Sequence, residues 1–268
     1  MNKKILNIIK KTAIEAGDIL LSYFGKLKKD QISYKNPVDL VTEADRVSEQ
    51  FIKKRLHRYF PSSSFYGEEE GLSGQRDAEL LFIVDPLDGT TNFVHTHPFF
   101  SISIACIKDK VPVCGIVFAP VIKMLYEAIQ KNGAKLNQKP IRVSKTSEIN
   151  QSLLITGFAC VRQRLKPDGI KLFNRLIYSA QGIRRSGSAA IDLCFVADGK
   201  ADLFWEIGLN PWDTAAGALI VKEAGGRVSD FKGKPYFENK KTIVASNGII
   251  HDEFIKIVKE TDRRYLSI

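Results

Sequence analysis

Apolar residues recur at helical spacing from residue 3 to about residue 27. Ile5, Ile9 and Leu20 fall on one side of this segment, and charged or polar residues occupy the other. Gly25 is expected to end the helix, because glycine readily adopts the left-handed conformation that closes helices. The spacing therefore predicts a long amphipathic helix here.

A second helix is predicted from about residue 42 to residue 60. Thr42 is expected as its N-cap, with Asp45 three positions on in a capping box. Apolar residues then follow at intervals of three and four, and Pro61 stops the pattern.

Strand patterns replace the helical spacing in the middle of the chain. Residues 81–84, Leu-Phe-Ile-Val, have the length and composition of a buried strand. From residue 101 to about residue 143, strand-like segments alternate with turns at Lys110 and at Asn132-Gly133. This alternation predicts antiparallel strands.

Beyond Leu153, strands alternate with helices. Helices are predicted over about 168–180, 188–198 and 213–225, the last closed by a Gly-Gly pair. The second part of the chain is thus expected to have α/β character.

This change of pattern divides the chain into an α+β half over about 1–150 and an α/β half over about 151–268. No repeat, low-complexity tract or flexible linker separates them. The length of 268 residues suits one large domain, and 44% hydrophobic with 26% charged residues is ordinary globular composition. We therefore expect one domain over 1–268.

The formal net charge of +10 admits an anionic ligand or nucleic acid. The lysines are spread along the chain without a basic block, so a well-solvated, lysine-rich surface is the simpler explanation. The charge alone identifies no partner.

No apolar run approaches the roughly 18 residues of a membrane span. Lys10, Lys11 and Glu15 interrupt the first predicted helix, which argues against a signal peptide. A cytoplasmic protein without a membrane partner is therefore expected. The cysteines form no CxxC motif and are expected to be buried free thiols; they are Cys106, Cys114, Cys160 and Cys194.

The segment Asp85-Pro86-Leu87-Asp88-Gly89-Thr90-Thr91-Asn92-Phe93 directly follows the strand predicted at 81–84. Its proline and glycine are expected to break the strand, which leaves two carboxylates at the rim of a buried sheet. Such a pair is unfavourable unless positive charge compensates it, and Mg²⁺ does so with carboxylate, carbonyl and water oxygens as ligands. An Asx turn with a helix cap and no metal is the alternative.

The same turn suits an anion. A helix that starts near Gly89-Thr90-Thr91 would point its free N–H groups and positive dipole end at a phosphate. Gly89 would let the main chain approach that phosphate closely.

Three acidic turns each follow or precede a predicted element: Gly67-Glu68-Glu69, the segment from Asp85 to Asp88, and Pro211-Trp212-Asp213. Together they could supply a two-metal site, which stabilises both oxygens of an in-line displacement at phosphorus. Separately, the first and third are weak signals, and Asp213 could simply cap the helix that follows it.

These segments resemble the inositol monophosphatase family, of the Mg²⁺-dependent, lithium-sensitive phosphatase superfamily. The resemblance rests on the nonapeptide from Asp85, on Trp212-Asp213-Thr214-Ala215-Ala216-Gly217, on Gly67-Glu68-Glu69 and on the segment from Asp39 to Asp45. They occur in the family's order along the chain. Arg184-Arg185-Ser186-Gly187-Ser188 is most similar to the bacterial branch.

The resemblance implies a site for two or three Mg²⁺ ions. The first ion is held by two acidic turns and a main-chain carbonyl, and one aspartate bridges it to the second. By position, the implied ligands are Glu68, Asp85 and Leu87 for the first ion, Asp85, Asp88 and Asp213 for the second, and Asp45 near a weaker third.

The resemblance also implies catalytic and substrate contacts. Glu68 and Thr90 match the positions that orient and activate the attacking water. Phosphate would bind the amides of Gly89 and Thr90, and the sugar or cyclitol would meet three residues of the second half. The implied substrate-binding residues are Leu87, Asp88, Gly89, Thr90, Arg184, Ala189, Glu206 and Asp213.

Some of these contacts have alternatives. Glu206 could pair with a lysine, and Arg184 with Asp192 or a nearby carbonyl. The family's mobile-loop lysine has only an approximate counterpart in Lys35, and Cys160 lies near a position often occupied by a small polar residue.

The implied protein is a homodimeric phosphatase with a layered α/β/α/β/α sandwich of the sugar-phosphatase type, an α+β and α/β fold. Its implied reaction is hydrolysis of inositol 1-phosphate to myo-inositol and phosphate. Fructose 1,6-bisphosphatase, or a sugar phosphatase of dual specificity, is the alternative enzyme. A regulatory protein that binds RNA or the transcription machinery is the alternative of another class.

Overall fold

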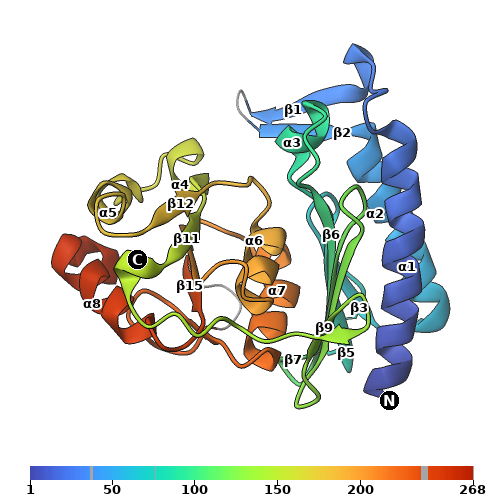
Figure 1. Ribbon diagram of the computed structural model, residues 1–268. Coiled ribbons are helices and arrows are strands. Elements are labelled where there is room, and N and C mark those ends of the chain that lie inside the picture. The colour runs from blue at the N-terminus through green and yellow to red at the C-terminus, as the bar shows by residue number, and fades with distance from the viewer. Residues whose placement is uncertain (37–38, 76, 237–240, 268) are drawn as a thin grey trace.

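The computed structural model describes residues 1–36, 39–75, 77–236 and 241–267. Their helices and sheets stack in five layers, in the order helices, sheet, helices, sheet, helices (Figure 1). The layered α/β/α/β/α arrangement is therefore confirmed.

One outer layer consists of helices α1 (Asn2–Tyr23) and α2 (Glu43–Tyr59), which pack on each other and on the larger sheet (Figure 1). The predicted stripe of α1 is buried, and Gly25 follows its end with a φ of 71°. The capping box of α2 forms as predicted, since Thr42 N and Oγ1 donate to Asp45 Oδ2 at 2.8 and 2.6 Å. Within the described ranges, none of the helices combines the length and the apolar character needed to cross a membrane.

The larger sheet has the strand order β10-β9-β8-β7-β6-β5-β3-β4. Neighbours from β6 to β10 are antiparallel, as the sequence predicts. Strand β5 runs antiparallel to β6 and parallel to β3. A separate hairpin joins β1 (Ile32–Asn36) to β2 (Asp39–Thr42). The strands are β3 (Ser64–Gly67), β4 (Gly71–Ser73), β5 (Leu80–Asp88), β6 (Ser101–Lys108), β7 (Val111–Ala119), β8 (Met124–Ile129), β9 (Ala134–Leu136) and β10 (Lys139–Pro140).

The smaller sheet has the order β12-β11-β13-β15-β14, with β11 parallel to both of its neighbours. Its strands are β11 (Leu153–Thr156), β12 (Gly182–Arg184), β13 (Leu203–Ile207), β14 (Arg227–Ser229) and β15 (Thr242–Ser246). Its outer face carries α4 (Ala159–Arg162), α5 (Ile170–Leu176) and α8 (His251–Thr261), and 3₁₀ turns occupy Lys29–Gln31, Ile149–Gln151 and Arg263–Leu266.

Helices α6 (Ala189–Ala197) and α7 (Pro211–Glu223) form the central layer between the two sheets (Figure 1). Both are buried nearly all round, because each packs on the other and on a sheet. Small residues permit this close packing: a β-carbon on Gly217 would lie 2.7 Å from Leu193 Cβ. The N-terminal ends of both helices are thereby held near the end of β5.

Strand β5 continues further than the apolar run predicts. Pairing with β6 reaches Asp85 opposite Ser103, then skips to Asp88 opposite Ser101. The expectation that Pro86 and Gly89 break the strand at Asp85 is therefore wrong. A bulge accommodates the proline, which has no N–H to donate, and the strand ends only after Asp88.

Candidate active site

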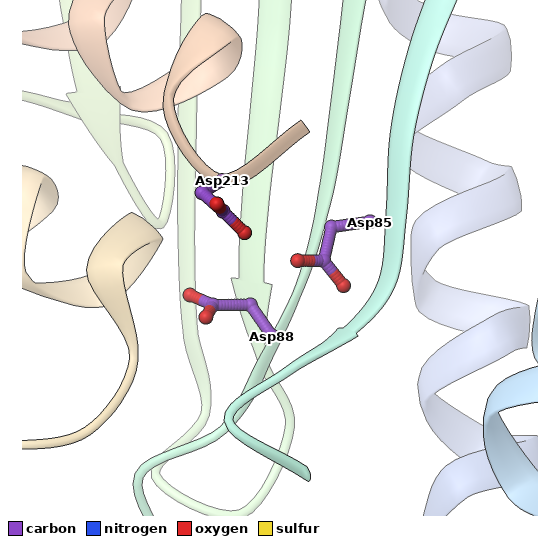
Figure 2. A group of neighbouring side chains, drawn as sticks. All are labelled: Asp85, Asp88 and Asp213. Atoms are coloured by element: carbon purple, nitrogen blue, oxygen red, sulfur yellow. The ribbon is translucent and has the colours of Figure 1, made fainter. Parts of the chain in front are cut away.

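Three aspartates converge where β5 ends and α7 begins. Carboxylate oxygens of Asp85, Asp88 and Asp213 all lie within 4.8 Å of one another, and Figure 2 shows the three side chains directed at a common space. Asp85 and Asp88 are buried, and Asp213 is half-buried. Acidic groups that lie up to 128 positions apart in the sequence thus share one small volume.

The cluster is electrostatically unfavourable when all three carboxyl groups are ionised. Burial and the neighbouring carboxylates raise the pKa of Asp85 and of Asp213 well above the usual range. Burial also raises the pKa of Asp88 to about 6, although the Ser188 hydroxyl bonded to it opposes the shift. A hard divalent cation bound between the three carboxylates would relieve this repulsion, and their oxygens are ligands that such a cation prefers.

Main-chain amides orient each of the three carboxylates. Leu87 N donates to Asp85 Oδ1 at 3.0 Å, and Asn210 N donates to Asp213 Oδ2 at 2.6 Å in a capping box at the start of α7. The expectation that Asp213 caps a helix beginning after it is wrong, because α7 already starts at Pro211 and Asn210 is the N-cap; Asp213 is the third residue of the helix and accepts a hydrogen bond from the Asn210 amide.

Asp88 is held by the first turn of α6. Ser188 Oγ and Ala190 N donate to Asp88 Oδ2 at 2.6 and 2.7 Å, and Ala189 N donates to Oδ1 at 3.3 Å. The positive end of the helix dipole favours the ionised carboxylate at this position. Ser188 belongs to the segment that resembles the bacterial branch, but its role in holding Asp88 was not predicted, because the two residues lie 100 positions apart.

The implied metal ligands lie together around a cavity of about 100 Å³. Glu68, Leu87 and the three aspartates all line it. Asp45 lies beside this cavity, where Thr90 Oγ1 donates to Asp45 Oδ1 at 3.1 Å. Burial, with a contribution from the nearby glutamates, raises the pKa of Asp45 to about 7.

The predicted anion-binding turn borders the same cavity. Helix α3 (Thr90–Val94) begins directly after Gly89, and residues 89–91 line the cavity. Gly89 has a φ of 98°, and a β-carbon there would lie 3.0 Å from Phe99 O and 3.2 Å from Gly187 O. Only glycine fits this conformation and spacing.

A second cavity of about 150 Å³ adjoins the first and shares Glu68, Asp88 and Asp213 with it. Ala189, Glu206 and Trp212 also line it. The tryptophan thus forms part of the wall of this cavity.

Glu206 lies at the base of the larger cavity, with 6% of its surface exposed. Ala159 N donates to Glu206 Oε1 at 3.0 Å, so the lysine partner proposed as an alternative is not what holds it. Burial raises the pKa of Glu206 to about 7. A β-carbon on Gly157 would lie 2.2 Å from Glu206 Oε2, a close approach for which the sequence offered no signal.

Arg184 is the implied substrate residue that the structure does not bring to either cavity. Its side chain is exposed, and its Nη1 donates to Ile183 O at 3.1 Å. Of the two alternative partners expected for Arg184, Asp192 or a nearby carbonyl, the structure therefore shows the carbonyl. Its neighbour Arg185 and Arg162 are also exposed, but both line the two cavities. The side chain of Lys35 lies outside the described residues.

Cys160 is buried behind the larger cavity, where Gly169 N donates to its Sγ at 3.4 Å. All four cysteines are buried and unpaired, as predicted. Nucleophilic catalysis by Cys160 is disfavoured, because burial raises the pKa of its thiol.

The arrangement combines a buried polycarboxylate pocket, an amide-rich turn beside it and a polar cavity for a small molecule. Carboxylates and a carbonyl can hold divalent cations, the turn can receive an anion, and Glu206 can accept hydrogen bonds from hydroxyl groups. This is suitable chemistry for the hydrolysis of a phosphate ester of a polyol.

Comparison with known proteins agrees with this chemistry. The model of the inositol monophosphatase family matches residues 1–263. An inositol-1-monophosphatase from Synechocystis is 42% identical over 257 residues, 96% of this chain and 89% of the relative. A Nus factor SuhB from Pseudomonas aeruginosa is 41% identical over 248 residues, 91% of each protein. The solved structure of an inositol monophosphatase from Anabaena has a TM-score of 0.88 at 38% identity, covering 97% of both chains.

Proposed function

Because this chain belongs to the inositol monophosphatase family and is a phosphatase by that membership, we propose that it hydrolyses inositol 1-phosphate to myo-inositol and phosphate. One observation carries the proposal: three carboxylates meet within 4.8 Å beside the Gly89 turn. The adjoining polar cavity, with Glu206 at its base, has room for a small polyol.

Mg²⁺ is a cation that this donor set suits, because all of the donors are hard oxygen atoms. Glu68, Asp85 and the Leu87 carbonyl would hold one ion, and Asp85, Asp88 and Asp213 a second. Asp45 would approach a third. When bound, the cations neutralise charge on the phosphoryl group and acidify water.

The protein's own groups supply binding and orientation. The amides of Gly89 and Thr90 bind phosphoryl oxygens at the start of α3. Glu68 accepts a proton from the attacking water, which Thr90 Oγ1 orients. The hydrogen bond from Thr90 Oγ1 to Asp45 leaves the hydroxyl oxygen free to accept one from that water. Asp45 is thus a positioning residue for Thr90 in this scheme.

The larger cavity receives the cyclitol. Glu206 accepts hydrogen bonds from ring hydroxyls, and its orientation is set by the amide of Ala159. Ala189 provides a small, buried surface that leaves room for the ring.

A substrate panel tests this proposal. Inositol 1-phosphate, fructose 1,6-bisphosphate and 3′-phosphoadenosine 5′-phosphate are assayed with Mg²⁺ and with a chelator. The highest kcat/KM is expected for inositol 1-phosphate, and only with Mg²⁺. Asp88→Asn is expected to lose turnover while circular dichroism shows a folded protein. Normal turnover in the folded Asp88→Asn protein would refute the assignment, and a preference for fructose 1,6-bisphosphate would replace it with the alternative sugar phosphatase.

A second role is favoured by one finding, the similarity to a protein named Nus factor SuhB. We propose that this chain also binds RNA or the transcription machinery, as a homodimer, with its net charge of +10 contributing to RNA binding. Binding should weaken steeply as salt rises if phosphate contacts dominate. A pulldown at physiological salt that retains no specific partner would exclude this role, and light scattering that finds a monomer would exclude the dimer.

A further inference from the structure

The proposed scheme leaves two cationic side chains of the site without a role. Arg162 at the end of α4 and Arg185 after β12 each line both cavities. In the part of the chain that the structure describes, neither forms an ion pair with a carboxylate. Both arginines favour the ionised form of Glu206, and Arg185 also that of Asp192, so these carboxylates compensate the positive charge in part but without a direct ion pair.

The side chain of Arg185 folds back across Gly187. A β-carbon on Gly187 would lie 2.5 Å from Arg185 Nη1 and 2.8 Å from Asn92 Nδ2. Gly187 has a φ of 94°, which favours glycine in any case. The missing side chain thus leaves the space in which the guanidinium of Arg185 rests, next to the side chain of Asn92.

This loop is fastened to the phosphate-binding turn. Asn92 Nδ2 donates to Ser186 O at 2.8 Å and to Phe99 O at 2.5 Å. The carbonyl oxygen of Gly187 lies close to Gly89, since a β-carbon placed on Gly89 would be 3.2 Å from it. The contacts of Ser186 and Gly187 thus fix the position of Arg185 beside the turn that would receive phosphate.

A phosphoryl group at this turn would bring further negative charge to a pocket lined by Glu68, Asp85, Asp88 and Asp213. A guanidinium offers planar, charged donors that match two phosphoryl oxygens, and it keeps its charge at any pH of interest. We propose that Arg185 is a further catalytic residue, which donates directly to the non-bridging oxygens of the phosphoryl group as it is transferred. This inference rests on the proposed phosphatase function.

The test compares Arg185→Gln and Arg185→Lys with wild type. Arg164→Gln serves as the matched control, because Arg164 is exposed two positions from Arg162 and lines neither cavity. For each protein kcat/KM is measured with inositol 1-phosphate, together with the inhibition constant of inorganic phosphate and the melting temperature. Direct binding of inorganic phosphate in the presence of Mg²⁺ is measured by calorimetry.

Arg185→Gln is expected to lose on the order of 100-fold in kcat/KM. It should also bind inorganic phosphate at least about tenfold more weakly, with an unchanged melting temperature. Arg185→Lys should recover part of both losses, because lysine restores the positive charge but not the two parallel N–H donors of the guanidinium. Arg164→Gln should match wild type.

Unchanged phosphate binding in folded Arg185→Gln would overturn the inference. A large loss of kcat/KM in Arg184→Gln, with no loss in Arg185→Gln, would also overturn it. A fall in melting temperature that accompanies the whole loss, without rescue by lysine, would assign Arg185 a structural role and overturn it as well. If wild type fails to hydrolyse inositol 1-phosphate, the proposed function fails, and the calorimetric comparison still decides whether Arg185 binds phosphate.

Discussion

Asp88 accepts a 2.6 Å hydrogen bond from Ser188 Oγ, which joins the end of strand β5 to the start of helix α6. The two residues come from different halves of the chain, and Asp88 is one of the three converging carboxylates. The orientation of a carboxylate of the acidic cluster in the first half therefore depends on a hydroxyl group in the second.

Ser188→Ala should weaken cation binding without unfolding the protein. Asp88 would keep the two amides of α6 but lose the hydroxyl donor. Losing such a supporting bond typically costs about 10- to 100-fold in metal affinity or activity. Titration of activity with Mg²⁺ measures the effect, and Ser179→Ala, which removes a hydroxyl from an exposed position, is the control. An identical Mg²⁺ requirement in both variants would contradict this relationship.

Asp213→Asn should lose activity yet gain thermal stability in the presence of a chelator. The variant keeps an oxygen to accept from Asn210 N but removes one charge from a cluster whose members repel each other. Calorimetry with chelator should show an equal or higher melting temperature than wild type. With Mg²⁺ the order should reverse, because wild type gains more stabilisation from binding the cation. A lower melting temperature in chelator would show that repulsion in the cluster is not significant.

Gly157→Ala should impair substrate binding through Glu206. The new β-carbon would lie 2.2 Å from Glu206 Oε2, so the carboxylate must move from the base of the larger cavity. The expected result is a decrease in kcat/KM of about tenfold or more, on the scale of a lost charged hydrogen bond. Gly169→Ala is the control, because a β-carbon there meets its nearest neighbour only at 3.8 Å. Equal kinetics in both variants would exclude a role for Glu206 in binding the substrate.

His251 should make the fold less stable in mild acid. The ring is fully buried between Ser229 Oγ and Ser246 Oγ, each 2.8 Å from a ring nitrogen. Burial, aided by Arg227, lowers its pKa from 6.5 to about 4. Between these values the unfolded chain binds a proton that the folded protein does not, so stability falls as pH decreases from 6.5 towards 4.

The loss attributable to His251 is up to roughly 3 kcal/mol over that interval. Urea unfolding of wild type and His251→Gln at several pH values measures it, since the difference between the two proteins cancels the contribution of the carboxylates. A difference that does not change with pH would contradict the assignment.

Local patterns account for the success of the sequence at the level of elements. The α1 stripe, the capping box of Thr42 and Asp45, and the antiparallel strands after Ser101 all depend on residues close together in the chain. The strand end at Asp85 was misplaced because Pro86 looks like a strand breaker in isolation. Only pairing with β6 shows that a bulge absorbs it.

The two adjacent arginines show the corresponding limit at the site. Arg184 and Arg185 have the same charge and nearly the same sequence context, and the resemblance to the family selected Arg184. The fold instead directs Arg185 to both cavities, because the glycine at 187 leaves space for its side chain. A difference of one position along a turn cannot be decided without the packing around it.

From sequence alone, most of the chain's elements and the positions of its acidic turns were determined, because short-range spacing and local residue chemistry encode them. The layered class followed from the resemblance of its motifs to a known family. Tertiary structure alone decided that Asp85, Asp88 and Asp213 share one pocket, that Ser188 and Gly157 shape it, and that Arg185 faces it. These relationships depend on how α6 and α7 pack between the two sheets, which brings together residues too far apart in the chain for any local pattern to connect.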